Sequence, residues 1–400
     1  MDKIKVVILG SNPMTRLSLI RSIGEAVDCE ISVVDMVHSI SKWRWAKTID
    51  SYSKYVSRYL QAQKYKADPL CDLLLKEFPD NGFKTYLFSV DDDSANLIDS
   101  VLDRLKEHFV CANINEEQGR LSKLMNKRIQ KELASQFGFN VTKSWTVEHR
   151  GGKYIVPEGI IFPCYLKGLM SYHTMKAQQG RFDSLKELEM FLEKLSSRYS
   201  HPMIVEEFLE IDKNLGVIGF CNGKECCVPC ITELLESGLG NHKGVSVLGL
   251  VRKEREGENI TSQVAAFVKS LGLFGLFNVD FVVSKNKLYF IELNLRFAAY
   301  GYAVTKAGVN LPEMFVNGSI TNVRAKVENN PIIECYYLNE KVALDDVING
   351  YRTIKDIKQL KQKANFGLMD NPTDGGPYSH LIRRAVPQYV KHQIKKLINR

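Results

Sequence analysis

Residues 277–296 read FNVDFVVSKNKLYFIELNLR, and the interpretation of the whole chain starts from this stretch. β-branched and aromatic residues on both sides of a short polar segment predict two antiparallel strands. If residues 285–287 form a three-residue loop, Asp280 lies directly opposite Glu292. Because side chains alternate between the two faces of a strand, Asn294 joins these carboxylates on one face.

Two interpretations of this acidic face are open. Two carboxylates and an amide oxygen repel one another unless a cation lies between them, and such hard oxygen ligands suit magnesium or manganese. Alternatively, the hairpin is amphipathic and its acidic face simply meets water. Arg296 follows directly, and a short turn comes after it at Ala298–Gly301. A cation, a guanidinium group and a tight turn together favour a phosphate-binding site.

The composition is that of an ordinary globular protein, with 44% hydrophobic and 25% charged residues among 400. This length suffices for two or three domains, each with its own core. No apolar run is long enough to span a bilayer, and the first residues, MDKIKVVILG, lead into an expected strand without a cleavable signal pattern. We therefore expect a cytoplasmic protein. The net charge of +8 favours anionic ligands, but no motif supports nucleic acid.

The chain has nine cysteines, and this odd number favours reduced thiols over a disulfide framework. Four of them lie close together, at Cys221, Cys226, Cys227 and Cys230, which raises the alternative of a structural zinc site. Asn222 and Gly223 predict a hairpin here, however, in which Cys227 and Cys230 point to opposite faces. This pattern disfavours zinc.

The first 118 residues predict a small open α/β domain. Lys5–Gly10 is a buried-strand run, followed by a helix-compatible stretch and a second strand, which is a βαβ start. Gly10–Pro13 lacks the G-x-G-x-x-G spacing, so NAD is disfavoured. Asp91–Asp93 follow a further strand. We interpret them as the N-cap and first-turn charges of a helix rather than as a metal site.

Further along the chain, polar residues stand at the ends of expected elements. A helix is predicted at 126–137 with Lys127 near its start, and an apolar strand ends in Lys167. Taken alone, a lysine at a strand end is normally a surface residue. Residues 203–210, MIVEEFLE, are a strand running into paired acids. The Gly-rich polar loop at 237–245 is long and lacks periodicity, as is typical of a ligand-covering segment.

In this order, these elements resemble the ATP-grasp superfamily over roughly residues 1–320. The most specific part is IELNLR at 291–296, which resembles the acidic-x-Asn-x-Arg signature of that family. The resemblance implies an ATP-grasp fold, α/β and α+β in class, preceded by an open α/β (Rossmann-like) domain. The parts expected are an N-terminal domain at 1–118, a small subdomain at 119–202, a nucleotide and metal subdomain at 203–325 and a C-terminal α/β extension at 326–400.

The resemblance also implies site residues and cofactors. It assigns the phosphates of ATP to Lys127 and Lys167, and one or two magnesium (or manganese) ions to Asp280, Glu292 and Asn294. Arg296 would stabilise charge on the transferred γ-phosphoryl group.

The strand at 203–210 would meet the rest of the nucleotide. The backbone near Glu206 and Phe208 is expected at the adenine edge, and Glu207 or Glu210 at the ribose, with Glu206 the first choice among these acids. The expected phosphate loop has one glycine at 168–174, where the family is commonly glycine-rich, so side chains such as Ser171 and Lys176 are expected to substitute.

The implied reaction joins a carboxylate to an amine. ATP phosphorylates the carboxylate to an acyl phosphate, and the amine attacks its carbonyl to give an amide, with release of ADP and phosphate. Positioning and electrostatic stabilisation carry such a reaction, so no side-chain nucleophile is required. We expect Lys243 and Arg252, in and after the polar loop, to contact the substrate carboxylate. An amino-acid or peptide ligase, resembling D-aspartate ligase, is the nearest type.

Two alternatives stay open. One is a biotin-dependent-carboxylase or carbamoyl-phosphate type of ATP-grasp enzyme, and the other is a non-catalytic nucleotide-binding regulatory protein. The last residues, LIRRAVPQYVKHQIKKLINR, are basic and partly amphipathic. We interpret them as a docked helix, with weak attraction to an anionic membrane surface as the alternative. A homodimer is a further open expectation.

Overall fold

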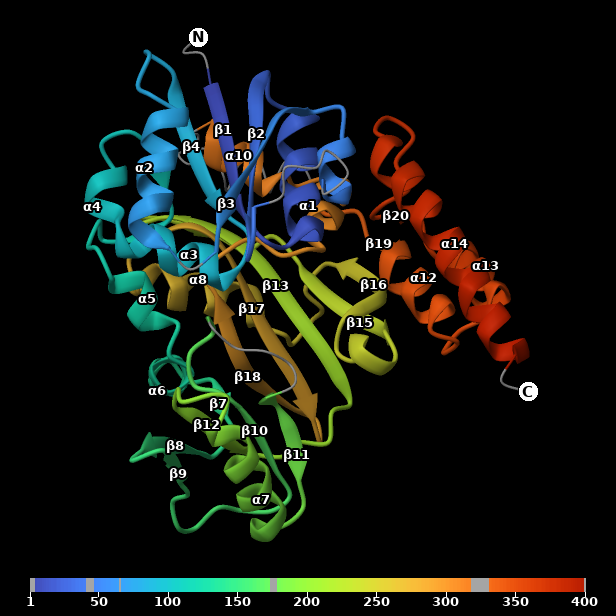
Figure 1. The fold of residues 1–400 in the computed structure, drawn as a ribbon. Helices are drawn as coiled ribbons and strands as arrows, with labels where there is room; N and C mark the ends of the chain where they lie inside the picture. The colour runs from blue at the N-terminus through green and yellow to red at the C-terminus, as the bar shows by residue number, and fades with distance from the viewer. Residues whose placement is uncertain (1–3, 41–46, 65, 173–177, 318–330, 399–400) are drawn as a thin grey trace.

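The computed structural model describes residues 4–40, 47–64, 66–172, 178–317 and 331–398, with side chains up to residue 394. Figure 1 shows a parallel sheet at the top, a large twisted sheet through the middle and a small sheet at the bottom, with the last helices along one side. No helix in the described ranges combines the length and apolarity that a membrane span needs.

The N-terminal domain is a parallel sheet in the order β3-β2-β1-β4-β5, flanked by helices. Asn12 caps α1 by accepting from Met14 N and Thr15 N. Asp91 forms a capping box with Ser94, which confirms the predicted N-cap of α3. The elements are β1 (Ile4–Gly10), α1 (Pro13–Gly24), β2 (Cys29–Val37), the 3-10 helix η2 (Ile49–Tyr52), β3 (Val56–Gln63), α2 (Ala67–Glu77), β4 (Lys84–Ser89), α3 (Asp92–Ser100), α4 (Leu102–Leu105) and β5 (Val110–Cys111).

The small sheet is antiparallel in the order β11-β10-β12-β8-β9. Its strand β12 pairs with both β10 and β8, so the boundary predicted at residue 203 cuts through a sheet. Two helices, α5 and α6, precede it. The elements are α5 (Arg120–Leu124), α6 (Lys127–Gln136), β8 (Ser144–Arg150), β9 (Lys153–Ile155), β10 (Cys164–Gly168), β11 (Gly180–Phe182), α7 (Leu185–Ser196) and β12 (Met203–Glu207).

The large sheet runs in the order β20-β19-β16-β15-β13-β17-β18-β7, with β14 and β6 at its sides. Because β19 and β20 belong to it, residues 335–367 continue this sheet instead of forming a separate unit. Its strands are β6 (Asn113–Ile114), β7 (Asn140–Val141), β13 (Lys213–Asn222), β14 (Cys226–Cys227), β15 (Ile231–Ser237), β16 (Ser246–Arg252), β17 (Leu273–Ser284), β18 (Lys287–Asn294), β19 (Cys335–Leu338) and β20 (Phe366–Gly367).

The remaining helices are η4 (Gly240–His242), α8 (Ile260–Ser270), α9 (Gly301–Lys306), α10 (Leu311–Val316), α12 (Glu340–Ile348), α13 (Ile354–Lys363) and α14 (Gly376–Ile398). The nine cysteines are all free thiols.

A buried arginine joins the first and last parts of the chain. The Arg21 side chain on α1 is fully buried and pairs with Asp374 at 2.9 Å, and it also donates to the carbonyl oxygens of Leu368 and Met369. The first turns of α14 lie nearby, against η2 and α12. The predicted terminal helix therefore docks through its N-terminal half.

The β17–β18 hairpin positions the site, and its details differ from the prediction in two ways. The loop has two residues, Lys285 and Asn286, both with positive φ (49° and 61°), as in a type I′ turn. A bulge then follows opposite Asp280. It is required because Phe290 and Leu293, three residues apart, both point into one hydrophobic core.

The two differences cancel. The shorter turn shifts the pairing by one residue, and the bulge shifts it back, so Asp280 still lies opposite Glu292 and Asn278 opposite Asn294. The predicted pairing of the carboxylates is confirmed, although the predicted three-residue loop is wrong.

The turn yields a stability prediction. Lys285 has φ 49°, a left-handed conformation that asparagine tolerates better than lysine. Lys285→Asn should therefore raise the free energy of unfolding by roughly 0.5–1 kcal/mol in denaturant titrations. Lys287→Asn, two residues on in the strand, is the matched control and should give no gain. Equal effects of the two substitutions would show that the turn is not under this strain.

Candidate functional site

Asp280 on β17 and Glu292 and Asn294 on β18 meet on one face of the large sheet. Both oxygens of Asp280 accept amide hydrogens: Oδ1 from Asn278 Nδ2 and Oδ2 from Asn294 Nδ2, each at 3.0 Å. Lys127 Nζ lies 3.3 Å from Glu292 Oε2. The acidic face is therefore hydrogen-bonded and ion-paired to other side chains, although Glu292 remains partly exposed.

The two carboxylates have opposite pKa shifts. Burial and the facing Glu292 raise the pKa of Asp280 to about 7. Burial also opposes ionisation of Glu292, but Lys127, Lys167 and Arg296 outweigh it and lower the pKa of Glu292 to about 2. Without a cation, one carboxyl of the pair thus keeps a proton close to neutral pH. A divalent cation would take the place of that proton.

The donor set fits magnesium. No group of three or more His, Cys, Asp or Glu side chains suited to a metal occurs in the described part of the chain. Two carboxylates and one amide oxygen suit Mg²⁺, which commonly completes its coordination with water and substrate phosphates. Asp280, Glu292 and Asn294 are therefore suited to an ion that arrives with a nucleotide.

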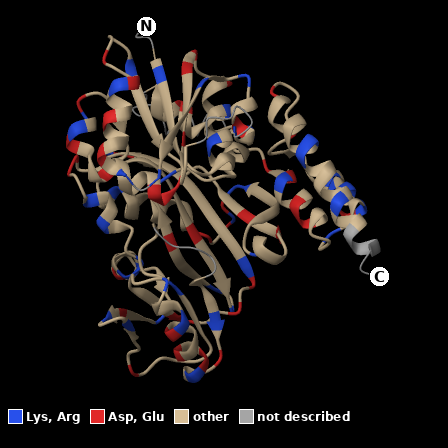
Figure 2. Ribbon diagram, viewed as in Figure 1, with Lys and Arg blue, Asp and Glu red and all other residues tan. Residues whose placement is uncertain are grey.

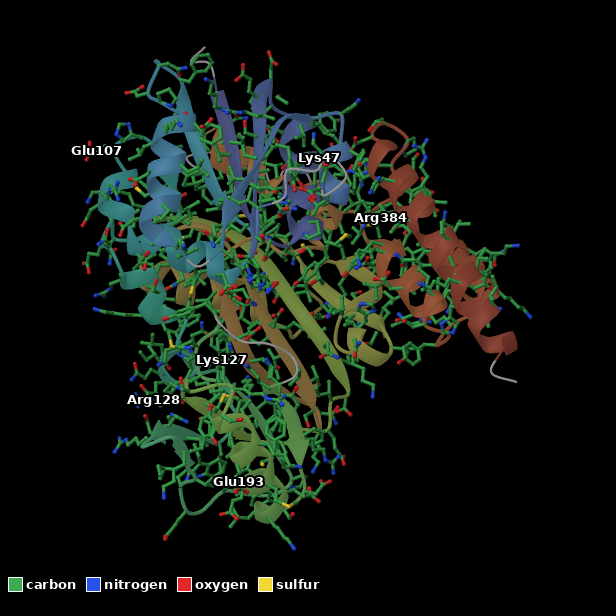
Figure 3. All side chains as sticks on the ribbon, in the orientation of Figure 1. Lys47, Glu107, Lys127, Arg128, Glu193 and Arg384 are labelled. Atoms are coloured by element: carbon green, nitrogen blue, oxygen red, sulfur yellow. The ribbon has the colours of Figure 1, made fainter. Side chains whose placement is uncertain are left out.

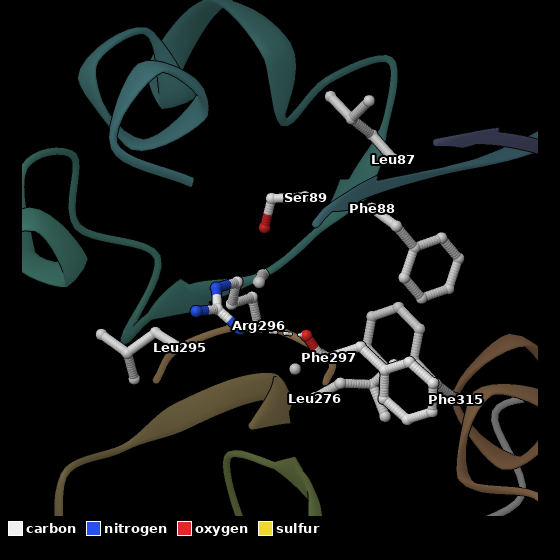
Figure 4. A pocket seen from close by; sticks show the side chains of 10 residues that line it. Leu87, Phe88, Ser89, Leu276, Leu295, Arg296, Phe297 and Phe315 are labelled. Atoms are coloured by element: carbon white, nitrogen blue, oxygen red, sulfur yellow. Dashed lines mark hydrogen bonds between the residues drawn. The ribbon is translucent and has the colours of Figure 1, made fainter. Parts of the chain in front are cut away.

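Arg296 is held by a residue that the sequence interpretation missed. Its Nε donates to Asp92 Oδ1 at 3.1 Å, and Nη2 donates to Asn294 Oδ1 at 3.2 Å. In Figure 4, Arg296 lies below Ser89. Both residues line a gap of about 10 Å³, which holds no more than a water molecule. The sequence analysis interpreted Asp91–Asp93 only as the N-cap and first-turn charges of a helix, so it did not predict that Asp92 pairs with Arg296.

Gln130 fixes Lys127 beside Glu292. Its side-chain amide donates to Leu293 O at 2.8 Å and accepts from Leu293 N at 2.9 Å, as a neighbouring strand would. This clamp holds the start of α6 against β18. In Figure 3, Lys127 lies toward the middle of the molecule and Arg128 toward the outer edge. Nothing in the sequence pattern singled out Gln130.

Lys167 and a second lysine share one buried carboxylate. Glu206 Oε1 lies 3.0 Å from Lys167 Nζ and 3.1 Å from Lys131 Nζ. Burial and the nearby Lys167 lower the pKa of Lys131 although Glu206 opposes this. Glu206, the first choice among the predicted nucleotide-binding acids, thus has its side chain buried between two lysines, and its expected role at the adenine edge concerns the backbone. Lys131 was missed, although it lies one helical turn after Lys127.

The remaining residues of the expected adenine strand have partners or are exposed. Phe208 N donates to Pro163 O, and Glu207 N donates to Lys143 O, both at 3.0 Å. Glu210 is exposed. Any adenine contact from this segment must therefore use backbone groups other than these two N–H groups.

The expected phosphate loop is partly described. Ser171 Oγ accepts from Lys127 Nζ at 2.9 Å, so these two predicted residues lie together. The backbone N–H of Ser171 donates to Met125 O, and that of Leu169 to Pro202 O. Lys176 lies outside the described residues.

A cavity of about 400 Å³ opens in front of the acidic face. This volume lies in the range of small-molecule sites. Asp280, Glu292, Asn294 and Arg296 line one side of it, and strands β13, β15 and β16 with the start of α1 line the others. Lining residues include Asn12, Thr232, Ser246, Asp280, Glu292, Arg296, Tyr300 and Tyr337.

Two predicted substrate residues have different environments. Lys243 is exposed, and the next residue, Gly244, lines the cavity. Arg252 is 2% exposed and bonded to Glu258 at 2.8 Å and Glu233 at 3.3 Å. The predicted substrate contact of Arg252 is corrected, because both carboxylates hold its guanidinium inside the fold. Its partners lie 19 and 6 residues away in the sequence, and a sequence pattern does not reveal such ion pairs.

Comparison with known proteins finds one family match. A family model described as an ATP-grasp domain matches residues 178–300, which include the cavity strands and the acidic face. Over these residues the chain is similar to ATP-grasp domains.

The curated relatives include carbamoyl phosphate synthase large chains. The chain is 24% identical over 305 residues to the C-terminal section of the carbamoyl phosphate synthase large chain of Aquifex aeolicus, covering 73% of this chain and 53% of that protein. It is 26% identical over 209 residues to the large chain of Campylobacter jejuni, covering 51% and 17%. The chain thus spans about half or less of the length of these relatives.

Solved structures confirm the predicted ATP-grasp fold. L-amino acid ligase from Bacillus licheniformis superposes with a TM-score of 0.62 at 12% identity, covering 84% of this chain and 79% of that one. Biotin carboxylase from Campylobacter jejuni gives 0.58 at 14% identity, covering 82% and 74%. N5-carboxyaminoimidazole synthetase from Staphylococcus aureus gives 0.58 at 15% identity, covering 87% and 85%. These identities show the fold alone.

The opposite pKa shifts predict opposite effects on stability in the absence of metal. The raised pKa of Asp280 means that stability falls as pH rises from about 4 to 7, because over this range the unfolded chain releases a proton that the folded protein still holds. Asp280→Asn should therefore raise Tm in EDTA at pH 8 by roughly 2–4 °C, and by less at pH 5.

Glu292→Gln is the counterpart. The lowered pKa of Glu292 contributes stability that is present above about pH 4 and is lost below it. Removing this carboxylate should therefore lower Tm at pH 8. Thermal melts in EDTA at pH 5 and 8 measure both variants. If both lowered Tm equally, the assigned charge states would be wrong.

Proposed function

We propose that this ATP-grasp protein is an ATP- and magnesium-dependent carboxylate–amine ligase. The observation that carries the proposal is the convergence of Asp280, Glu292, Asn294 and Arg296 on one wall of a cavity of small-molecule size. Likeness in fold to an L-amino acid ligase supports it. The proposed products are an amide or peptide bond, ADP and phosphate.

Each residue group has a proposed role. Lys127 and Lys167 bind the phosphates, exchanging part of their contacts with Glu292 and Glu206 for phosphate oxygens. Asp280, Glu292 and Asn294 would hold magnesium, which neutralises negative charge on the phosphates. Arg296, kept in place by Asp92, stabilises charge on the phosphoryl group as it is transferred.

The adenosine end of the nucleotide is proposed to lie along the strand end at 206–210, as the family resemblance implies. Glu207 or Glu210 would serve the ribose, since the Glu206 carboxylate is already shared by two lysines. Ser171 and Lys176 are proposed to assist at the phosphates.

Small-molecule carboxylates and amines are the proposed substrates, and Lys243 at the cavity rim is the proposed contact for the substrate carboxylate.

We also propose that the reaction takes place in the cytoplasm, where ATP and magnesium are supplied. A homodimer and weak contact of α14 with an anionic membrane surface are further proposals. The second is supported by Figure 2, since α14 carries basic residues and its sequence has no Asp or Glu.

A second candidate function is a bicarbonate-using reaction of the carboxylase or carbamoyl-phosphate type. The observation favouring it is that the curated relatives include carbamoyl phosphate synthase large chains. A non-catalytic nucleotide-binding protein is the remaining alternative, and the intact set of Asp280, Glu292, Asn294 and Arg296 argues against it, because a binding-only protein need not keep all the metal ligands.

One assay tests the proposed function. ADP and phosphate release from Mg·ATP is measured over a panel of carboxylates with and without amines, and with bicarbonate. Amine-dependent release with an amide product is the expected result. Bicarbonate-dependent release supports the second candidate, and no release across the panel supports the non-catalytic one.

Glu292→Gln should reduce the turnover found in this assay by about 100-fold or more, because it removes one of two carboxylates facing the cation. Glu193→Gln, on the exposed surface of α7, is the matched control and should leave turnover unchanged. Normal turnover in Glu292→Gln would rule out the assigned metal face.

Lys243→Ala should raise the KM for the carboxylate about tenfold with little change in the KM for ATP, as expected for one lost charged contact. Arg252→Ala should instead lower Tm, since it leaves Glu258 and Glu233 unpaired. Unchanged carboxylate KM in Lys243→Ala would remove this residue from the proposed site.

A further inference from the structure

We propose that Tyr300 is a positioning residue for the metal face, acting through Asn278 on the carboxylate of Asp280. The inference rests on the proposed function only in that Asp280 binds a divalent cation. It concerns a residue with no assigned role in the reaction, just before α9 and beside the cavity.

The hydrogen bonds run in one direction. Tyr300 Oη donates to Asn278 Oδ1 at 2.6 Å, and Asn278 Nδ2 donates to Asp280 Oδ1 at 3.0 Å. A carboxylate accepts only, so Asn278 must turn its NH₂ group toward Asp280 and its oxygen away. That oxygen then needs a donor. Burial, reinforced by Asp280, raises the pKa of Tyr300 well above its ordinary value, so the hydroxyl keeps its proton and supplies that donor.

Gly216 provides the space for this hydroxyl. It lies on β13 directly opposite Asp280 in the sheet. A Cβ at this position would clash with Tyr300 Oη and would lie 2.9 Å from Thr232 Oγ1. The Thr232 hydroxyl donates to Gly216 O at 2.9 Å and so occupies the other side of the same space. Any larger residue at 216 would push Tyr300 away from Asn278.

The hydrogen bonds from Tyr300 through Asn278 fix one carboxylate oxygen of Asp280, and those from Arg296 through Asn294 fix the other. Arg296 Nη2 donates to Asn294 Oδ1, and Asn294 Nδ2 donates to the second oxygen of Asp280. Removing the Tyr300 donor would take away this partner of Asn278 Oδ1, so the amide would be held less firmly with its NH₂ group toward Asp280. Asp280 would then lose its fixed orientation toward the cation, and the affinity for the cation would fall.

The experiment measures Mn²⁺ affinity directly, by electron paramagnetic resonance of free Mn²⁺ in the presence of saturating ADP at pH 8. Tyr300→Phe and Gly216→Ala should each weaken Mn²⁺ binding about fivefold, the effect expected for one lost hydrogen bond. Tyr337→Phe is the matched control. The ring of Tyr337 is stacked on that of Tyr300, with 6.3 Å between the ring centroids, but Tyr337 takes no part in the hydrogen bonds from Tyr300 to Asp280. Loss of its hydroxyl should therefore change the Mn²⁺ affinity less than twofold.

A double substitution separates positioning from general damage. Asn278→Ala should weaken binding by a similar factor, and Tyr300→Phe should add nothing in that background, because the link is already cut. The inference would be overturned if the losses of Mn²⁺ affinity from Asn278→Ala and Tyr300→Phe multiplied in the double variant. It would also be overturned if the Tyr300→Phe protein bound Mn²⁺ like the unmodified one. Either result would leave the metal site itself intact. Failure of the unmodified protein to bind Mn²⁺ would overturn the metal assignment and this inference together.

Discussion

The repulsion between Asp280 and Glu292 is the constraint on which the site depends. Two carboxylates brought together on a half-buried face cannot both ionise unless positive charge surrounds them. This positive charge comes from different parts of the structure: Lys127 lies on α6, Lys167 on the small sheet and Arg296 in the loop after β18. Local strand pairing thus brings the two carboxylates together, and only the tertiary fold supplies the positive groups that allow ionisation.

The same charges also hold the parts of the protein together. Arg296 and Asp92 connect the loop after β18 to the N-terminal domain, Lys127 and Glu292 connect α6 to β18, and Glu206 connects the small sheet to α6 through Lys131. The four basic groups Lys127, Lys131, Lys167 and Arg296 face the four acidic groups Asp92, Glu206, Asp280 and Glu292. Phosphates that bind here would compete with these acids, so nucleotide binding and the relative placement of the subdomains are linked.

Much of this was accessible from the sequence because strand alternation and motif spacing are local properties. The pairing of Asp280 with Glu292 was predicted correctly even though the loop was one residue too long, since an unpredicted bulge compensated. Such bulges depend on which side chains the core accepts, here Phe290 and Leu293 together, and no local pattern encodes that.

The misses have one physical cause, which is that charged side chains acquire distant partners. Asp92 lies in the first turn of α3 and also accepts a hydrogen bond from Arg296, 204 residues away. Glu206 was expected to face a ligand and instead neutralises two lysines. Arg252 was expected at the substrate and is neutralised by Glu258 and Glu233. In each case the residue type indicated the chemistry correctly, and only the fold decided the partner.

The buried pair of Arg21 and Asp374 has a consequence for synthesis of the chain. The acceptors of Arg21 at 368, 369 and 374 lie 347, 348 and 353 residues further along the chain. Until they are made, a guanidinium in the middle of α1 faces water or an incomplete core, and an unpaired buried charge is costly. During synthesis, the domain that contains α1 therefore reaches its final packing only after residues 368–374 have been translated.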